Sequence, residues 1–401
     1  MTSPPSRVAP MNGPSSHDTD GVSDAERSLL RKSVRDLLAN IWPADKVAEN
    51  SGNAQAIATL WPAMARQGLA SLGSNAGEVG LREIVLVFEE LGRASCPAPL
   101  LGAVAANLAL ATQHSNARAD EPGSGRVSSA RPRASSDALC ARTSIESCVL
   151  LADLHQGNAT VALALGNFDG DPAAGRVVVR GDTLQGKMSF VEGAQTASHL
   201  LIFTDAPAGT AVVAADAQGV TMRATPGLAV PPFCELTFEN APALWLEHSS
   251  EALADIALAA RLACAGRALG AAQRGFDLAV EHVKVRKQFG QLVGQFQAVQ
   301  HKLANCLISL DGARLALETA AEARDNDNPD WRIFAAAALA FAGPALRTVS
   351  IETHRTLGAI GYAEEHEAPR HFRRVHSDLA RFGGVSRARA ELADDLLGPV
   401  G

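Results

Sequence analysis

Two long patterns of apolar positions, spaced three and four residues apart, occupy residues 262–320. The apolar positions of the first are Leu262, Ala265, Leu269, Ala272, Phe276, Ala279 and Val283, and those of the second are Phe296, Val299, Leu303, Cys306, Leu310, Ala313, Leu317 and Ala320. This spacing places one apolar seam along each of two helices. Because only residues 290–294 connect the two patterns, we predict antiparallel neighbouring helices whose seams need further helices to bury them.

Helical patterns also precede and follow this pair. The earlier ones span residues 24–40, 54–67, 81–94 and 100–111. The later ones span 331–352, with a kink expected at Gly343-Pro344, and a final helix that breaks at Gly383-Gly384 and resumes to Leu397. Between residues 159 and 242, short β-leaning runs alternate with turn residues, which is typical of a small antiparallel barrel or sandwich.

These patterns predict an α+β fold that is mainly α. Its parts are an N-terminal helical domain, a small central β-domain and a C-terminal four-helix bundle. The predicted boundaries are a disordered Pro-, Ser- and Gly-rich tail at 1–22, the helical domain at 23–115, a flexible insertion at 116–136, the β-domain at 144–246 and the bundle at 247–401. A length of 401 residues, at roughly 150 per domain, agrees with two to three folding units.

Composition narrows the classes of partner. The hydrophobic share is 47% and the formal net charge is -7, without a basic face along any stretch, so we expect neither nucleic acid nor an anionic membrane surface as a partner. The six cysteines lack Cys-x-x-Cys spacing and are interpreted as reduced thiols of a cytoplasmic protein. No apolar run approaches the roughly 20 residues of a spanning helix, so we predict no membrane span.

Candidate chemistry lies at the joint between the two long helices, Arg286-Lys287-Gln288-Phe289-Gly290, followed closely by Gln295, Gln297 and Gln300. One interpretation is a capping charge, because cations in a last helical turn are favoured by the helix dipole. The other is a dinucleotide site, because an arginine fork and amides suit phosphates and polar base edges. The pattern by itself leaves both open.

At these residues the chain resembles the acyl-CoA dehydrogenases, flavoproteins with an Arg-x-Gln-Phe-Gly-x-x-x-x-x-Phe-Gln-x-x-Gln pattern in their C-terminal bundle. The matching positions are Arg286, Gln288, Phe289, Gly290, Phe296, Gln297 and Gln300. Residues 88–94, followed by Pro97, Pro99, Leu100 and Leu101, also resemble the family's N-terminal helical domain. The resemblance implies bound FAD, an acyl-CoA substrate, a separate electron acceptor and a homo- or hetero-oligomer with flavin sites shared between subunits.

A second segment, residues 355–362, resembles the family's Gly-Gly-x-Gly-Tyr/Phe motif, which helps to bind FAD across a subunit contact. The resemblance implies cofactor contacts from Arg355, Leu357, Gly358 and Ala359, in addition to Arg286, Gln288, Phe289 and Gln297. Arg355 stands where the family has a glutamine, and Ala359 replaces one glycine.

Two departures concern the chemistry. The family removes the substrate α-proton with a carboxylate, and the two positions implied for it here are 382–384 and the neighbourhood of Ala260, neither of which is acidic. Asp378, one turn earlier on the final helix, is a candidate base, with an exposed helix charge as its alternative role. The family's Thr-Glu-Pro-x-x-Gly-Ser loop beside the flavin is replaced by Leu165-Gly166-Asn167-Phe168-Asp169.

Two hypotheses about function follow. The first is FAD-dependent α,β-dehydrogenation of an acyl-CoA thioester, in the context of fatty acid or steroid side-chain catabolism. The second is a catalytically silent FAD-binding or structural subunit of a hetero-oligomeric acyl-CoA dehydrogenase. Metal chemistry is not expected, because His366, His371 and His376 advance by five residues at each step, about 140° around a helix, and so share no face.

Overall fold

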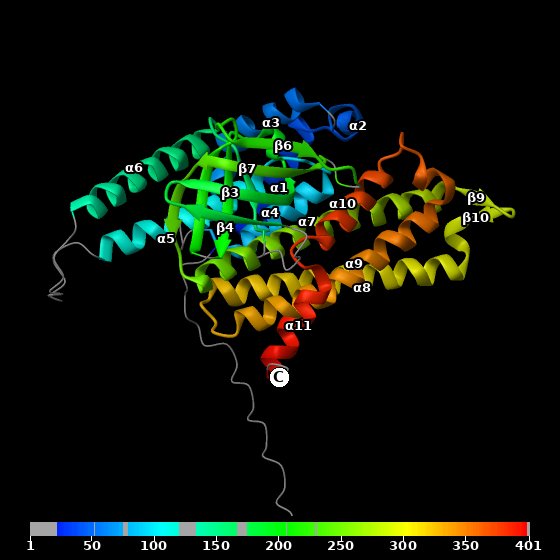
Figure 1. Cartoon of the computed structure of the whole chain (residues 1–401). Helices are drawn as coiled ribbons and strands as arrows, with labels where there is room; N and C mark the ends of the chain where they lie inside the picture. Colours follow the sequence, from blue (N-terminus) through cyan, green and yellow to red (C-terminus); the bar gives the residue numbers. More distant parts are fainter. Residues whose placement is uncertain are drawn as a thin grey trace, which may run out of the picture.

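The computed structural model describes residues 22–51, 53–74, 79–119, 134–166, 175–205, 207–227, 229 and 231–398. The predicted tail, apart from Val22, and most of the predicted insertion at 116–136 lie outside these residues. Within them the predicted fold class is confirmed, with N-terminal helices, a small β-region and a C-terminal helical bundle (Figure 1).

The N-terminal helices agree closely with the apolar patterns. Their bounds are α1 Asp24–Ile41, α2 Val47–Asn50, α3 Ala54–Arg66, α4 Leu81–Arg93, α5 Leu100–Ala119 and α6 Ala134–Gln156. Helix α1 begins where Ser23 and Glu26 form a reciprocal capping box, whereas α3 begins where the side chain of Asn53 accepts from the backbone N–H groups of Gln55 and Ala56. Helix α6 was not predicted. Residues 144–156, which the sequence analysis assigned to the β-domain, belong to this helix.

The start of α4 is capped from a distant part of the chain. The carboxylate of Asp325, the last residue of α8 (Gln297–Asp325), accepts hydrogen bonds from the backbone N–H groups of Leu81 at 2.6 Å and Arg82 at 3.0 Å. A negative charge at a helix N-terminus is favoured by the helix dipole. This contact fastens the N-terminal helices to the bundle.

Helices α4 and α7 (Ser250–Val285) cross closely enough that only glycine fits at the crossing. A Cβ atom on Gly92 would lie 1.8 Å from the carbonyl oxygen of Arg267, and one on Gly270 would lie 1.7 Å from that of Glu89. The crossing brings the charged residues of α4 next to α7, where Arg267 is 1% exposed.

The β-region consists of two four-stranded sheets packed face to face. One has the order β1-β4-β5-β8 (Val161–Ala164, His199–Asp205, Ala208–Ala214, Leu244–Glu247), and the other β2-β3-β7-β6 (Gly175–Arg180, Thr183–Glu192, Phe233–Pro242, Val220–Ala224). Fully buried side chains, including Leu184, Leu200 and Leu236, fill the space between them.

One strand pair departs from the predicted antiparallel arrangement. Strands β1 and β4 run parallel, with Val161 opposite His199 and Ala164 opposite Ile202. A parallel pair needs a long crossover connection, and here the chain passes through β2 and β3 of the other sheet between the two strands. Alternating patterns within single strands carry no information about this crossover.

The bundle contains α7 Ser250–Val285, α8 Gln297–Asp325, α9 Trp331–Leu357, α10 Ala368–Ala380 and α11 Gly384–Leu397. The predicted break between the last two helices is confirmed, since Gly383 adopts the left-handed region with φ 77°. Helix α9 continues through Pro344, where the sequence predicted a kink. Two short connections, residues 286–296 and 326–330, make α7, α8 and α9 successive antiparallel neighbours (Figure 1).

In the described part of the chain, one helical segment, Trp331–Tyr362, is long and apolar enough to cross a membrane by length and composition alone. Half of its most apolar window is buried inside the protein, where α9 packs against α7, α8 and α11. The core helix of a bundle has the same composition, so the absence of a membrane span stays a prediction.

Candidate functional site

The joint between α7 and α8 forms a projecting hairpin, which we call the corner and define as residues 286–297. Helix α7 ends at Val285, and Lys287–Gln288 pair with Gln291–Leu292 as the short strands β9 and β10. Phe289 and Gly290 make the turn with φ angles of 50° and 82°. Positive φ at both central residues is the geometry of tight hairpin turns. The corner extends beyond the end of the bundle (Figure 1).

The predicted cofactor residues of the corner face solvent. Phe289 is 93% exposed, and its ring makes an edge contact with Phe296 at 6.2 Å between ring centroids. Arg286, Gln288 and Gln297 are exposed as well, and within the described residues their side chains make no hydrogen bond or ion pair. Arg286 is the C-cap residue of α7 and its backbone N–H donates to the carbonyl oxygen of His282, so its role as a capping charge stays open beside the predicted cofactor role.

The second predicted segment lies at the same end of the bundle. Leu357, the last residue of α9, is buried in a small cluster with Leu278 and Ala279 of α7 and Ala368 of α10. Those α7 residues lie two helical turns before the corner. The structure therefore places the two predicted cofactor segments at one end of the molecule.

Within this segment the predicted residues have different surroundings. Gly358 has φ 64° and open space where a Cβ atom would stand, and Ala359 is exposed in the 3-10 turn Gly358–Tyr362. The guanidinium of Arg355 is held by Glu352, which also pairs with Lys302 at 3.0 Å. Arg355, which stands where the family has a glutamine, is therefore already paired within the chain. Arg286 has no such partner among the described residues.

Asp378 is not the exposed charge that its position on the final helix suggested. Its residue is 4% exposed, and its two carboxylate oxygens accept hydrogen bonds from Nε and Nη2 of Arg267 at 2.9 and 2.8 Å. Arg267, on α7, is itself 1% exposed. Such a bidentate pair fixes both side chains and leaves the carboxylate bound to its partner.

Three further side chains complete what we call the arginine cluster: Glu192, Arg267, Arg374, Asp378 and Arg381. Glu192, at the end of β3, accepts from Arg267 at 2.7 Å, Arg374 at 2.9 Å and Arg381 at 2.6 Å. Burial alone raises the pKa of Glu192, but the three guanidinium groups outweigh burial and hold this pKa well below its usual range. The cluster joins the β-region to α7 and α10.

Members of the arginine cluster line a small cleft beside residues 382–384, one of the two positions implied for the catalytic base. The cleft lies between residues 97–102, β1, the end of β3 and α7, and its volume is only about 20 Å³. Glu192, Arg267 and Arg381 line it, and Arg381 directly precedes Phe382-Gly383-Gly384. Next to Ala260, the other implied position, Arg261 is buried and pairs with Glu391 of α11 at 2.7 and 2.9 Å.

Sequence reasoning missed Glu192, Arg267 and Arg381. A usable signal existed for Arg267, which stands among Ala265, Gly266 and Ala268 in the most apolar part of α7, because an arginine in such surroundings requires a buried anion.

The predicted departure in the flavin-side loop falls mostly on residues 167–169, which lie outside the described residues. The three histidines at 366, 371 and 376 have separate partners, and His371 Nδ1 lies 3.1 Å from Ser95 Oγ.

Comparison with known proteins assigns the class. The family model "Acyl-CoA dehydrogenase, C-terminal domain" matches residues 255–390, the bundle that carries the corner. Acyl-CoA dehydrogenase IpdE2 of Mycobacterium tuberculosis is 30% identical over 359 residues, covering 88% of this chain and 91% of that protein. The chain belongs to the acyl-CoA dehydrogenase family, a family of oxidoreductases.

Solved structures agree with this assignment. The Tcur3481-Tcur3483 steroid ACAD variant matches with a TM-score of 0.75 and 26% identity, covering 92% of this chain and 97% of that one. The ChsE4-ChsE5 complex from Mycobacterium tuberculosis, at 20% identity and a TM-score of 0.74, covers 95% and 99% and has the same fold. The human mitochondrial short-chain specific acyl-CoA dehydrogenase is 38% identical over 137 residues, 34% of this chain and 33% of that protein.

Proposed function

We propose that this chain is a subunit of a hetero-oligomeric, FAD-dependent acyl-CoA dehydrogenase, in which a related partner chain carries the catalytic base. The chain itself supplies the corner, which contacts the nucleotide part of FAD held mainly by the partner. Its own cleft is catalytically silent. The assembly removes two hydrogens from the α,β-bond of an acyl-CoA thioester and passes the electrons to a separate acceptor.

The observation that carries this proposal is that the two carboxylates near the cleft, Glu192 and Asp378, are both held by arginines. A general base works best when its pKa lies near the working pH. Glu192 has a pKa held well below its usual range by three arginines, and Asp378 is locked in a bidentate pair with Arg267. To accept an α-proton, either carboxylate would have to leave its arginine partners. The buried guanidinium groups would then have no counter-charge, which is costly.

The corner suits the nucleotide part of FAD. A pyrophosphate needs charge-assisted donors, and the guanidinium of Arg286 supplies them in a planar fork. The exposed amides of Gln288 and Gln297 offer donors and acceptors, and the 93% exposed ring of Phe289 offers an apolar face. Because these groups face away from their own bundle, the flavin they contact belongs to a neighbouring subunit.

When bound, FAD supplies the hydride acceptor for the β-carbon. The residues of this chain bind and orient the cofactor through the corner, which α7 and α8 carry, and through residues 357–359, which follow α9 and lie beside α10. Two of the structurally similar proteins are named by two chains each, Tcur3481-Tcur3483 and ChsE4-ChsE5, which supports a pair of related subunits.

The test is to purify the chain alone and together with the chain that copurifies with it from its native cell. The chain alone is expected to lack the yellow flavin absorbance and to leave acyl-CoA thioesters unchanged in the presence of an electron acceptor. The pair is expected to be yellow, and its flavin absorbance is expected to bleach on addition of the thioester. A chain that binds flavin and bleaches by itself would overturn the proposal.

The second candidate is the complete enzyme, active as a homo-oligomer. It is favoured by the 30% identity to IpdE2, which is named as an acyl-CoA dehydrogenase and is matched over 91% of its length. This candidate requires the arginine cluster to open when the thioester enters. Bleaching by the isolated chain, lost in the Asp378→Asn variant, would support it.

A further inference from the structure

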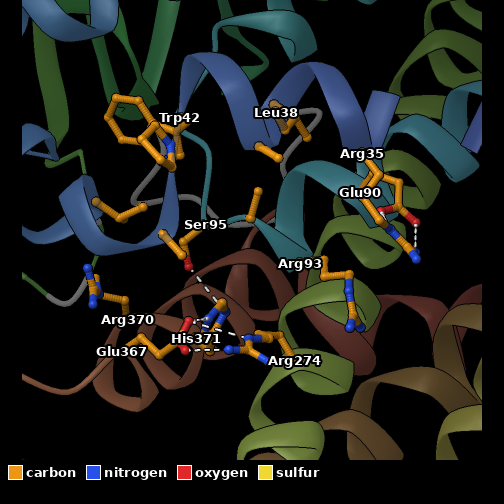
Figure 2. A pocket seen from close by; sticks show the side chains of 15 residues that line it. Arg35, Leu38, Trp42, Glu90, Arg93, Ser95, Arg274, Glu367, Arg370 and His371 are labelled. Atoms are coloured by element: carbon orange, nitrogen blue, oxygen red, sulfur yellow. Dashed lines mark hydrogen bonds and ion pairs between the residues drawn. The ribbon is translucent and has the colours of Figure 1, made fainter. Parts of the chain in front are cut away.

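A second cavity, separate from the cleft, lies between the N-terminal helices and the bundle. Its volume is about 290 Å³, near the lower end of the range for small-molecule sites. One wall is the end of α1 with residues 42–47, and the other is the end of α4 with parts of α7 and α10 (Figure 2). Among the described residues, the two cavities have no lining residue in common.

Ser95 lines this cavity on an unusual backbone. It follows α4, where the N–H of Cys96 donates to the carbonyl oxygen of Leu91 at 2.9 Å and the N–H of Ser95 donates to that of Gly92 at 3.1 Å. These two bonds form a Schellman motif, which requires a left-handed residue and favours glycine there. Ser95 occupies this position with φ 50°, a conformation that side chains disfavour. Such local strain is often found at functional sites.

The hydroxyl of Ser95 lies at the head of a chain of polar contacts. Its Oγ atom is 3.1 Å from Nδ1 of His371 on α10, and Nε2 of His371 is 3.5 Å from Oε2 of Glu367, one helical turn earlier. Arg274 of α7 fixes Glu367 at 2.5 Å. Figure 2 shows Ser95, His371, Glu367 and Arg274 in succession at the cavity.

The charges decide which nitrogen of His371 carries its proton. Burial raises the pKa of Glu367, but His371 and Arg274 outweigh burial and lower this pKa to about 2. The carboxylate can therefore only accept, so the imidazole presents its N–H to Glu367 from Nε2 and leaves Nδ1 to accept from Ser95. Burial lowers the pKa of His371, which keeps the imidazole neutral at neutral pH and able to take a proton.

The rest of the lining indicates which substrates fit. Three lining arginines already have carboxylate partners: Arg35 with Glu90 at 2.8 Å, Arg93 with Asp277 at 2.7 Å, and Arg274 with Glu367 at 2.5 Å. Leu38, Trp42 and Val47 add apolar lining. Because these charges are paired within the chain, the cavity favours a small uncharged molecule over an ion.

A hydroxyl, an imidazole and a carboxylate in this order correspond to a nucleophile, its general base and the group that orients the base. We infer that this cavity hydrolyses a small uncharged carboxylic ester, with Ser95 as nucleophile, His371 as its general base and Glu367 as a positioning residue. This activity is independent of flavin binding, because its residues belong neither to the corner nor to the arginine cluster.

The reaction needs only water as a co-reactant. Oγ of Ser95 forms a bond to the carbonyl carbon of the ester, while its proton passes to Nδ1 of His371. The bond between that carbon and the alcohol oxygen breaks, and the alcohol leaves with the proton from His371. Water then attacks the acyl group on Ser95, which releases the carboxylic acid and restores the hydroxyl.

The test uses the full chain with two probes. Diisopropyl fluorophosphate reacts with nucleophilic serines and loses fluoride, and p-nitrophenyl acetate reports ester hydrolysis through the absorbance of p-nitrophenolate. Mass spectrometry is expected to find one label, on the peptide that contains Ser95, and the labelled chain is expected to lose its ester hydrolysis. Absence of a label, or a label only on other residues, would overturn the inference.

Ser95→Gly removes the hydroxyl and supplies the residue that the left-handed position favours, so this variant is expected to fold. Its hydrolysis of p-nitrophenyl acetate should fall by about a hundredfold or more, the usual contribution of a positioned base and its nucleophile. Ser71→Ala is the matched control, because Ser71 is also half-buried, donates to the carbonyl oxygen of Gly68 and does not line the cavity. Hydrolysis retained in folded Ser95→Gly, or lost equally in Ser71→Ala, contradicts the inference.

His371→Gln tests the base separately. It keeps Ser95 in place, and labelling by diisopropyl fluorophosphate should slow by about a hundredfold or more. His301→Gln serves as its control, because His301 is exposed on α8. An unchanged labelling rate in folded His371→Gln would show that the imidazole does not activate the hydroxyl, and the inferred site would then be wrong.

The pH profile of labelling tests the role of Glu367. In the wild type the rate should fall as His371 is protonated, with a midpoint below the ordinary histidine pKa of 6.5, because burial and the charges of Arg274 and Arg370 lower this pKa while Glu367 raises it. Glu367→Gln removes the carboxylate, so the midpoint should move to lower pH. A variant that labels more slowly at every pH with an unmoved midpoint would show a structural role, and the assignment of Glu367 would be wrong.

Discussion

The corner and the arginine cluster use the same side chain in opposite ways. In the cluster, Arg267 is 1% exposed and donates to both Asp378 and Glu192. At the corner, Arg286 is exposed and its side chain has no partner in the described part of the chain. In the cluster the arginines form ion pairs with carboxylates of the same chain, whereas at the corner the guanidinium of Arg286 is not engaged by any described residue.

The difference lies in solvation. A buried guanidinium has lost its water, so it persists only with anions in contact, and the resulting network fixes the segments that carry it. An exposed guanidinium keeps its water and can exchange it for a phosphate at small cost. In this molecule the buried arginines line the small cleft and are held by carboxylates, whereas the exposed side chain of Arg286 has no partner among the described residues.

The largest expected effect follows from breaking the cluster. Replacing Arg267 with alanine leaves Asp378 and part of Glu192 buried without their partner, which should lower the free energy of unfolding by about 3–5 kcal/mol. Urea denaturation at neutral pH measures this change. The control is Arg223→Ala, because Arg223 is 76% exposed in its pair with Glu235, and a surface pair contributes at most about 1 kcal/mol. Equal losses in the two variants would remove the distinction between the buried and the exposed arginines.

An intermediate effect concerns acid stability. Burial raises the pKa of Glu192, but Arg267, Arg374 and Arg381 outweigh it, so the folded pKa lies below the unfolded value of about 4.5. A group with a lowered folded pKa stabilises the protein above its unfolded pKa, and this contribution is lost as the pH falls below about 4.5. The free energy of unfolding, measured in urea from pH 7 downward, should therefore decline below that point.

The matched variants for the acid measurement are Glu192→Gln and Glu364→Gln. Glu192→Gln should be less stable at neutral pH and should show a shallower decline with acid, because the titrating group is gone. Glu364, whose side chain is 73% exposed, should leave the decline unchanged when replaced. A wild-type slope retained in Glu192→Gln would assign the acid sensitivity to other carboxylates.

The smallest effect on stability is expected at the corner. Arg286→Ala should change the free energy of unfolding by no more than about 0.5 kcal/mol, as is usual for exposed side chains without partners. The flavin content of the assembled protein, measured by absorbance after gel filtration, should nevertheless fall at least about tenfold on loss of a charge-assisted contact. Unchanged flavin content in the folded assembly would reduce the corner to a polar hinge.

Much of the fold could be predicted because its information is local. The spacing of Leu262 to Ala320 determined two helices and their antiparallel arrangement, and Gly383-Gly384 marked the break before α11. The helix α6 was missed because its apolar and polar residues are not sorted onto separate faces. The parallel β1–β4 pair was missed because it joins strands separated by the whole of β2 and β3.

The residues of the candidate site also fall into two groups: those that the sequence could predict and those that only the structure brings together. The resemblance to a family motif was enough to predict Arg286, Gln288 and Phe289 as cofactor residues, because they are close together in the chain, and residues 355–359 were predicted for the same reason; both sets stay predictions. Only the tertiary structure decided that Glu192, Arg267 and Asp378 meet, because up to 186 positions separate them and their contact depends on how α7, α10 and β3 pack. The type of a charged residue is written in the sequence, but its solvation and its partner exist only once the chain has folded.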